Sequence, residues 1–385
     1  MTSYETREPT AVASHELSLD EADVDAVVER MRSALTGGDL TAGPQVSEFE
    51  GALREYTGRR AAVAVANGTA ALELVLRALG VGPGHEVLVQ SGSFIASAAA
   101  VASVGAHVRF VDMAPDQLGP TAAQVEAALG PATTAVLVTH LGGLISGHLD
   151  DVARLCRERG LRLIEDAAQA LGSLHDGRAP GSWGVAATFS FYARKVLTTG
   201  EGGAVVTDDP DLARLVRLLG DQGRSPDGVH RIFGTNARMT EFQAALGLVQ
   251  FDRLDERLAA RRAIAARYDA AFGPHRRPVP PQVRPNHYKY WLELPTERHR
   301  DDFAAALAEQ LVELPGPLTG HALPIHRQPA SADRSTPEEL PETDRFASTH
   351  VCLPVYPGLT EDRVERVIAA GRRALNGVGS GNEEE

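Results

Sequence analysis

The chain has 385 residues, of which 43% are hydrophobic, and a formal net charge of −13 at pH 7. This length predicts a large core and two domains, whereas the negative charge argues against general binding to nucleic acid or to anionic membranes. The two cysteines, Cys156 and Cys352, are too few for a disulfide framework and lack the spacing of metal ligands, so we expect no metal.

Both ends of the chain are polar. Residues 1–20 are acidic and lack the basic and apolar regions of a signal peptide. The longest apolar stretch, around residues 94–106, is too short to span a bilayer. We therefore expect a cytoplasmic protein in which residues 1–20 and 377–385 form disordered tails.

Short β-rich runs alternate with helical segments between about residue 60 and residue 250. The runs span residues 61–66, 86–90, 107–112, 134–140, 161–166, 186–192 and 203–208. Continuous apolar strands separated by helices are typical of a mainly parallel sheet that is covered by helices on both faces. We therefore assign residues 21–250 to a large α/β domain.

A second region follows the alternating one. A long helical pattern runs from Thr240 to Phe272, and a proline-rich connector occupies residues 273–286. The segment YKYWLELP, residues 288–295, predicts a strand. The helix expected after it carries apolar residues one turn apart, namely Phe303, Leu307 and Leu311. We assign residues 251–376, including the interdomain helix, to a smaller α+β domain.

Lysine is almost absent from this chain. Nearly all of its 38 basic residues are arginines, and the two lysines are Lys195 and Lys289. Lys195 lies in FSFYARKVLTTGEGG, after an apolar run and before a glycine cluster. An arginine at this position would serve equally for solubility or for ion pairing, but it could not lose its proton and attack a carbonyl. Lys195 is therefore a candidate nucleophile.

Three further segments reach the sheet edge at which parallel α/β folds bind ligands. In VANGTAALEL, Gly68 and Thr69 open a helix, so backbone N–H groups and a hydroxyl could hold a phosphate, although the glycine could serve the turn alone. In LRLIEDAAQA, Asp166 ends a strand and Gln169 follows, an acidic pattern that could instead cap the next helix. In TFSFYARK, Ser190 lies near the end of another strand.

An aromatic residue completes the set. Phe94, in SGSFIAS, opens another helix, and its ring could stack on a flat ligand or simply join the core. A phosphate cradle, a carboxylate, an aromatic ring and the Lys195 amine are together the groups that pyridoxal 5′-phosphate (PLP) requires. The amine forms a Schiff base, and the carboxylate keeps the pyridine nitrogen protonated so that the ring accepts electrons. These residues predict a PLP site.

In these segments the chain resembles the DegT/DnrJ/EryC1/StrS family of sugar aminotransferases, which has the PLP-dependent transferase type I (aspartate-aminotransferase-like) fold. NGTAAL, IEDAAQALGS, TFSFYARKVLTTGEGG and NARMTEFQAALGL match in order and spacing, and the resemblance covers nearly the whole chain. It implies that Lys195 forms the Schiff base and then moves the proton between substrate and cofactor. It also implies that Asp166 pairs with the pyridine nitrogen, that Gln169 contacts the 3′-oxygen, and that Phe94 stacks on the ring.

The same resemblance implies a phosphate site that two chains share. Gly68, Thr69 and Ser190 would hold the phosphate from one subunit of a homodimer. Asn236, in NARM, would reach it from the neighbouring subunit.

Residues on the substrate side are expected in the small domain and in an arginine-containing segment. The resemblance places Lys289 near the substrate or its phosphates, with Tyr288, Arg224 and Arg231 close to it. The alternative for Lys289 is the edge of a strand, where its stem packs and its charge reaches solvent. His326, in PIHRQPA, matches a family segment near the mouth of the site.

We therefore expect a homodimeric, ping-pong aminotransferase that takes an amino group from glutamate or glutamine. The acceptor would be a keto-sugar, nucleotide-linked, or a keto-cyclitol, in the biosynthesis of antibiotics and other secondary metabolites or of cell-surface sugars. Three alternatives are a sugar dehydratase of the same fold, in which histidine replaces the lysine, a non-catalytic PLP-binding regulator, and a nucleotide-binding dehydrogenase. Lys195 argues against the first two, and the lack of G-x-G-x-x-G after the first strand argues against the third. The chain departs from the family at Gly142, where a tyrosine is usual, and at Ala98–Ala100, where an asparagine is usual.

Overall fold

The computed structural model describes residues 11–321, 323–332 and 339–379. The large domain contains a seven-stranded sheet with the order β1-β8-β7-β5-β4-β2-β3. Its strands are β1 (Ala61–Val65), β2 (Glu86–Gln90), β3 (His107–Val111), β4 (Thr133–Thr139), β5 (Arg162–Asp166), β7 (Ala186–Ser190) and β8 (Gly203–Thr207). In this sheet β8 runs antiparallel to both neighbours and the other pairs are parallel, so the predicted α/β fold with a mainly parallel sheet is confirmed.

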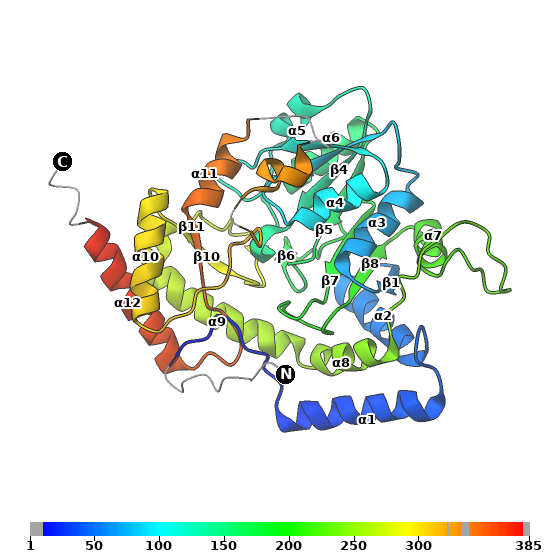
Figure 1. Cartoon of the computed structure of the whole chain (residues 1–385), viewed down its shortest axis with the longest axis horizontal. Helices are drawn as coiled ribbons and strands as arrows, with labels where there is room; N and C mark the ends of the chain where they lie inside the picture. Colours follow the sequence, from blue (N-terminus) through cyan, green and yellow to red (C-terminus); the bar gives the residue numbers. More distant parts are fainter. Residues whose placement is uncertain (1–10, 322, 333–338, 380–385) are drawn as a thin grey trace.

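Helices cover both faces of this sheet (Figure 1). One face is covered by α3 (Gly68–Ala78), α4 (Ile95–Ser103) and α7 (Pro210–Gly220). The other is covered by α2 (Pro44–Thr57), α5 (Ala122–Ala128), α6 (Leu149–Glu158) and α8 (Glu241–Phe251), and α1 (Glu21–Gly37) packs on α8.

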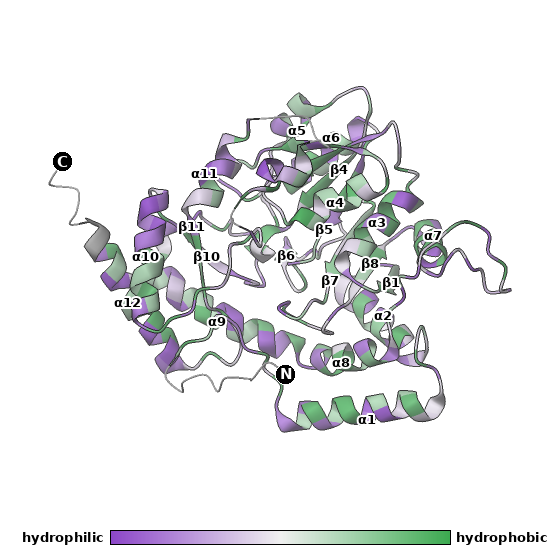
Figure 2. Ribbon diagram, in the orientation of Figure 1, coloured by the Kyte–Doolittle hydropathy of each residue, from purple (hydrophilic) through white to green (hydrophobic). Residues whose placement is uncertain are grey.

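Successive side chains of a strand point to opposite faces of the sheet, and helices bury both of these faces. In β8, Val205 joins the core under α3 and α7, whereas Ala204 and Val206 join the core under α2 and α8. The strands must therefore be apolar along their whole length, and Figure 2 shows them as predominantly hydrophobic.

The small domain pairs β10 (Tyr290–Glu293) with β11 (His350–Leu353) in antiparallel orientation. Its core also takes residues from α9 (Leu254–Phe272), α10 (Glu297–Glu309) and α12 (Glu361–Gly379). Beside it lie α11 (Pro341–Thr349) and the short antiparallel pair of β6 (Leu174–His175) and β9 (Val283–Arg284).

Two sequence predictions about helices need correction. The pattern predicted as one helix from Thr240 to Phe272 forms α8 and α9, which are separated after Phe251. Phe303 and Leu307 are fully buried as predicted, but Leu311 lies beyond the end of α10 and is 49% exposed. Its φ of 57° is left-handed, because the chain turns there to pair with the N-terminal segment.

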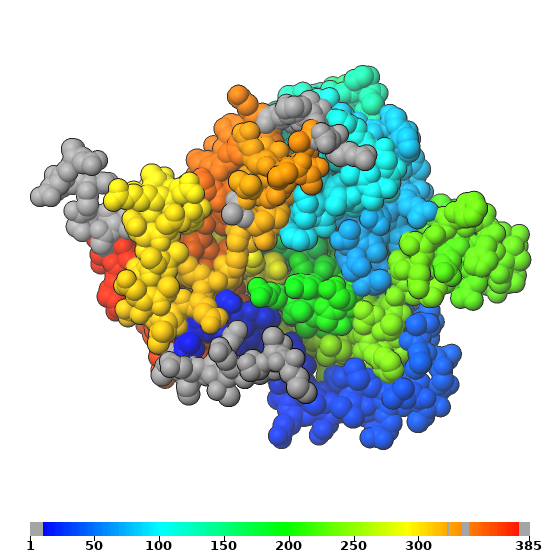
Figure 3. Space-filling view, viewed as in Figure 1, coloured from blue at the N-terminus to red at the C-terminus, as the bar shows by residue number. Residues whose placement is uncertain are grey.

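The prediction of a disordered tail over residues 1–20 was wrong for residues 11–20; residues 1–10 lie outside the described residues. Val12 is fully buried, and its backbone pairs with the segment around Val312 through hydrogen bonds of 2.9 Å. In Figure 3 this blue segment lies against the yellow and orange residues of the small domain. The polar composition concealed it because two adjacent buried residues, Val12 and Ala13, rather than a periodic pattern, anchor it. At the other end, α12 continues to Gly379, so the part of the predicted tail from residue 377 to 379 is helical.

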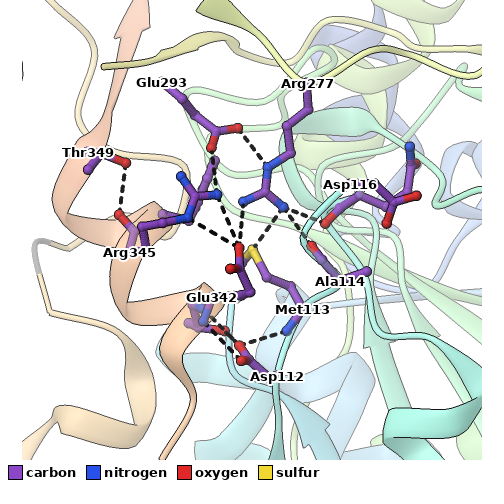
Figure 4. Close-up of polar contacts among 12 residues, drawn as sticks. Asp112, Met113, Ala114, Asp116, Arg277, Glu293, Glu342, Arg345 and Thr349 are labelled. Carbon is purple, nitrogen blue, oxygen red and sulfur yellow. Dashed lines mark hydrogen bonds and ion pairs between the residues drawn. The ribbon is translucent and has the colours of Figure 1, made fainter. Parts of the chain in front are cut away.

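The two domains are joined by a buried polar contact that Figure 4 shows. Arg277 pairs with Glu293 at 2.7 Å and donates to the carbonyl of Ala114 at 2.7 Å. Asp112, which follows β3, accepts hydrogen bonds from the backbone N–H groups of Glu342 and Thr343 at 3.0 and 2.8 Å. The loop after β3 therefore holds the N-terminus of α11. Among the described residues no helix is long and apolar enough to cross a membrane, and the cytoplasmic location stays a prediction.

Candidate active site

A cavity of about 870 Å³ lies where the carboxyl ends of the parallel strands face the small domain. The end of β4 and the loops after β1, β2, β5 and β7 contribute to its wall. The residues singled out from the sequence that line it are Gly68, Thr69, Phe94, Asp166, Gln169, Ser190, Lys195, Tyr288 and Lys289. The sheet topology therefore brings the predicted cofactor residues of one chain together.

The start of α3 forms a close-packed cradle against β7. A Cβ atom on Gly68 would lie 2.9 Å from Cβ of Ser190, so only glycine allows this approach. Asn67 caps the helix by accepting a hydrogen bond from the N–H of Ala70 at 2.8 Å. The N–H groups of Gly68 and Thr69 come too early in the helix to have intrahelical acceptors. Together with the Ser190 hydroxyl they fit the charge and size of a phosphate.

The carboxylate of Asp166 is held by two donors. Ser97 donates its hydroxyl hydrogen to Oδ2 at 2.7 Å, and the backbone N–H of Ala168 donates to Oδ1 at 3.1 Å. Ser97 in turn contacts Ser93, and Ser93 contacts Thr139, each over 2.7 Å between hydroxyl oxygens. This buried hydroxyl chain fixes the plane of the carboxylate.

The neighbouring carboxylate serves the strand rather than the cavity. Glu165 points to the opposite side of β5, where it accepts from His140 at 3.0 Å and from backbone N–H groups of residues 181–184. Burial alone would raise the pKa of Glu165, but the hydrogen bond with His140 and the backbone donors hold it below its usual range. Glu165 therefore stays ionised and anchors the end of the strand that carries Asp166.

Lys195 supplies the reactive amine. Its Nζ lies 4.7 Å from the centroid of the Tyr288 ring, and its backbone N–H donates to the carbonyl of Tyr192 at 2.8 Å. Burial lowers the pKa of Lys195 to about 8, although the nearby negative charge of Asp166 opposes this shift. A useful fraction of the amine is therefore neutral at physiological pH and able to attack a carbonyl.

Gln169 and Phe94 form two other parts of the wall. Oε1 of Gln169 accepts from the N–H of Gly142 at 2.7 Å. Gly142 has a φ of 68°, and a Cβ atom there would lie 3.1 Å from Cδ2 of Leu318. The chain is therefore tightly packed at the position where the family usually has a tyrosine. The Phe94 ring is 47% exposed and stacks on His321 at 5.8 Å between ring centroids, so its free face can receive a flat ligand.

Four predicted residues lie outside the cavity of a single chain. Asn236, Arg224 and Arg231 belong to the exposed segment between α7 and α8, where Arg224 pairs with Asp221 at 3.1 Å. His326 is buried at the domain boundary, where its Nδ1 lies 2.6 Å from the Ser91 hydroxyl. Their roles stay predictions.

Sequence reasoning missed several cavity residues. Ser14 and His15 reach the cavity from the segment that was expected to be disordered, and no local sequence pattern predicts this. Sequence reasoning also missed Ser97, which holds Asp166 without lining the cavity itself; it lies three residues after Phe94, a spacing that could have suggested it. Arg194 lines the cavity and directly precedes Lys195, so its position alone was a usable signal.

The donor set fits PLP. The helix start suits the phosphate, Asp166 suits a protonated pyridine nitrogen, and Lys195 suits the aldehyde. These groups occupy one cavity whose volume of about 870 Å³ leaves room for a substrate beside the cofactor.

The chain is similar to known proteins over most of its length. The profile of the DegT/DnrJ/EryC1/StrS aminotransferase family matches residues 21–372. GDP-perosamine synthase of Caulobacter vibrioides is 37% identical over 360 residues, which are 91% of this chain and 95% of that protein. A dTDP-3-amino-3,4,6-trideoxy-alpha-D-glucose transaminase of Streptomyces venezuelae is 37% identical over 357 residues, 91% of this chain and 92% of that one. The PLP form of Spr1654, a candidate sugar aminotransferase of Streptococcus pneumoniae, superposes with a TM-score of 0.86 at 26% identity, covering 96% of this chain and 99% of that chain.

Proposed function

The chain belongs to the DegT/DnrJ/EryC1/StrS aminotransferase family and is therefore a PLP-dependent aminotransferase, and we propose that it moves an amino group from glutamate or glutamine to a nucleotide-linked keto-sugar. One observation carries the proposal: Lys195 and Asp166 line the same cavity. The pKa of Lys195 is lowered, and the carboxylate of Asp166 is held in place by Ser97. A keto-cyclitol is the alternative acceptor.

PLP supplies an aldehyde that reacts with amines and a ring that accepts electrons. Lys195 would hold the cofactor through its aldehyde in the absence of a donor. The freed Nζ of Lys195 would then take a proton from the α-carbon of the donor and deliver it within the cavity. Asp166 would hold the proton of the pyridine nitrogen, and Gln169 would orient the ring through its 3′-oxygen. The donor would leave as a keto acid before the acceptor binds, and its amino group would stay in the site for the acceptor, which would give ping-pong kinetics.

The acceptor proposal rests on two relatives whose names contain nucleotide-linked sugars, one with GDP and one with dTDP. Lys195 argues against the alternative of a sugar dehydratase, and a regulator that binds PLP without turnover has no need of this amine. We place the reaction in the biosynthesis of an antibiotic or cell-surface sugar, in the cytoplasm.

We also propose a homodimer with shared sites. The segment between α7 and α8 projects from the large domain (Figure 1) and exposes Phe233 to 95%. On α1, Val24, Val28 and Leu35 are 48%, 48% and 63% exposed. Apolar side chains at such exposure favour burial against another chain. Asn236, in the projecting segment, would then reach the phosphate site of the partner.

Borohydride reduction of the PLP-loaded protein tests the proposal. Reduction should fix the cofactor covalently, and peptide mass spectrometry should find it on Lys195. Addition of L-glutamate before reduction should release 2-oxoglutarate and abolish the labelling. The cofactor on Lys289, or on no residue, would contradict the assignment.

A further inference from the structure

Arg194 presents a positive charge inside the candidate active site. It is exposed, lines the cavity and directly precedes Lys195. Among the described residues, no carboxylate lies within 4.0 Å of its guanidinium, although Glu73 and Glu201 line the same cavity. Asp166, by contrast, has a defined partner in Ser97. The charge of Arg194 is therefore available to a ligand.

A second cation on this wall, Lys289, already donates hydrogen bonds to the backbone. Lys289 donates from Nζ to the carbonyl oxygens of Gly316 and Pro317 at 2.7 and 2.6 Å. An ammonium has three N–H donors, so only one remains for a ligand. Lys289 therefore fixes the loop that carries Pro315 and Leu318 into the cavity wall, and Arg194 remains with its full set of donors.

His15 reaches the same place from the N-terminal segment and positions the backbone next to Arg194. It lines the cavity and forms a hydrogen bond with the backbone of Ala193, next to Arg194. Burial, and after it the charges of Arg261 and Arg194, hold the pKa of His15 below its ordinary value. The imidazole is therefore neutral at pH 7, and its single N–H is already given to the Ala193 carbonyl. His15 thus holds the backbone next to Arg194 and adds no second charge beside it.

The segment that carries His15 is held firmly. Glu16 pairs with Arg363 at 3.0 Å, and the Ser18 hydroxyl accepts from the N–H of Gly358 at 3.1 Å. Val12 is paired on the other side of His15. His15 is thus pre-positioned, and little ordering entropy would be lost on binding.

We propose that Arg194, with His15 beside it, binds an anionic oxygen group of a substrate of the proposed transfer reaction. The planar guanidinium offers paired N–H donors that match a carboxylate or a phosphate. The two sources in this reaction are the carboxylate of the amino donor and the diphosphate of a nucleotide-linked acceptor. This inference rests on the proposed function for the identity of the substrates, and on the cavity geometry for the site.

Affinity measurements on three variants of the PLP-loaded protein test the proposal. Arg194→Met removes the charge and keeps the stem, Arg194→Lys keeps the charge without the fork, and Arg298→Met removes an arginine that is 89% exposed on α10. L-glutamate affinity comes from the concentration dependence of the cofactor absorbance change, and dTDP and GDP affinities come from calorimetry. Light scattering checks that the mass in solution is unchanged.

Arg194→Met should weaken either glutamate or the diphosphates by roughly 10- to 100-fold, and the other ligand by less than about twofold. Arg194→Lys should lose less affinity than Arg194→Met, and Arg298→Met should bind all three ligands as tightly as the wild type. Loss for glutamate identifies the donor carboxylate, and loss for dTDP or GDP identifies the diphosphate.

Unchanged affinity for all three ligands in Arg194→Met would overturn the proposal, as would an equal loss in Arg298→Met. A lower mass in solution with affinity recovered at high protein concentration would also overturn it, because Arg194 would then act in subunit contact. Failure of the proposed function looks different, since borohydride would leave no cofactor on Lys195. Calorimetric titration with glutamate and the diphosphates needs no turnover and would still decide the role of Arg194.

Discussion

The Ser97 hydroxyl lies 2.7 Å from Oδ2 of Asp166, and both side chains are buried. Ser97 comes from α4 and Asp166 from the end of β5, so this hydrogen bond joins a helix and a strand at the carboxyl edge of the sheet. The carboxylate is thereby oriented before any ligand arrives.

Ser97→Ala should weaken PLP binding by about tenfold, because a hydrogen bond to a charged group typically contributes about 1.5–3 kcal/mol and part of this serves orientation. Equilibrium dialysis of the purified protein measures the affinity. Ser97→Thr keeps the hydroxyl and should retain most of it, and Ser103→Ala on the same helix is the matched control. Wild-type affinity in Ser97→Ala would show that the hydroxyl chain does not position Asp166.

The amine of Lys195 should become reactive near pH 8, because burial lowers its pKa to about 8. The neutral fraction grows as pH rises through that value and is about a tenth at pH 7. The rate at which PLP-free protein captures PLP should therefore rise with pH and level off above about pH 9. Nα-acetyl-lysine, measured in parallel, should still be rising there. If the pH midpoint of PLP capture by the protein lay near that of Nα-acetyl-lysine, the lowered pKa of Lys195 would be contradicted.

Replacement of Lys195 by alanine should reduce amino transfer from glutamate by at least about a hundredfold, because proton transfer by a positioned group contributes roughly 10²–10⁴. The fold should persist, since the amine makes no ion pair shorter than 4.0 Å among the described residues. Release of 2-oxoglutarate and thermal unfolding measure the two effects. Activity within tenfold of the wild type would reject Lys195 as the proton carrier.

Asn236→Ala should weaken PLP retention about tenfold if the site is shared between subunits, because one phosphate contact is lost. Mixing Asn236→Ala with Lys195→Ala sharpens the test. In a mixed dimer one site would combine the intact Lys195 of one chain with the intact Asn236 of the other, so roughly a quarter of all sites should regain tight PLP binding. No recovery after mixing and subunit exchange would argue against shared sites.

Asp112→Ala should lower the free energy of unfolding by about 1–2 kcal/mol, the usual cost of losing a helix cap. Asp112 accepts from Glu342 and Thr343 at the start of α11, and from the Thr343 hydroxyl at 2.6 Å (Figure 4). Urea unfolding measures the change. Asp302→Ala, at an exposed position on α10, should have little effect. Equal losses in both variants would show that the cap is unimportant.

The sequence by itself predicted the strands of the sheet and grouped the candidate cofactor residues at one of its edges. Each sheet strand is a continuous apolar run, because helices bury both of its faces, and the predicted runs agree with the observed strands to within two residues. Once the sheet is parallel, residues that end separate strands must meet at one edge. Asp166, Ser190 and Lys195 therefore needed no tertiary information to be grouped.

Only the tertiary structure decided which side chains complete the cavity. His15 meets Ala193, and Lys289 meets Gly316 and Pro317, across contacts that no periodic pattern encodes. Val12 and Ala13 are the buried apolar residues that anchor the N-terminal segment, and two adjacent residues are too few for a periodicity argument. Local patterns report burial on a repeating face, whereas these positions depend on where distant loops end. The charge left free on Arg194 follows from those same loop positions.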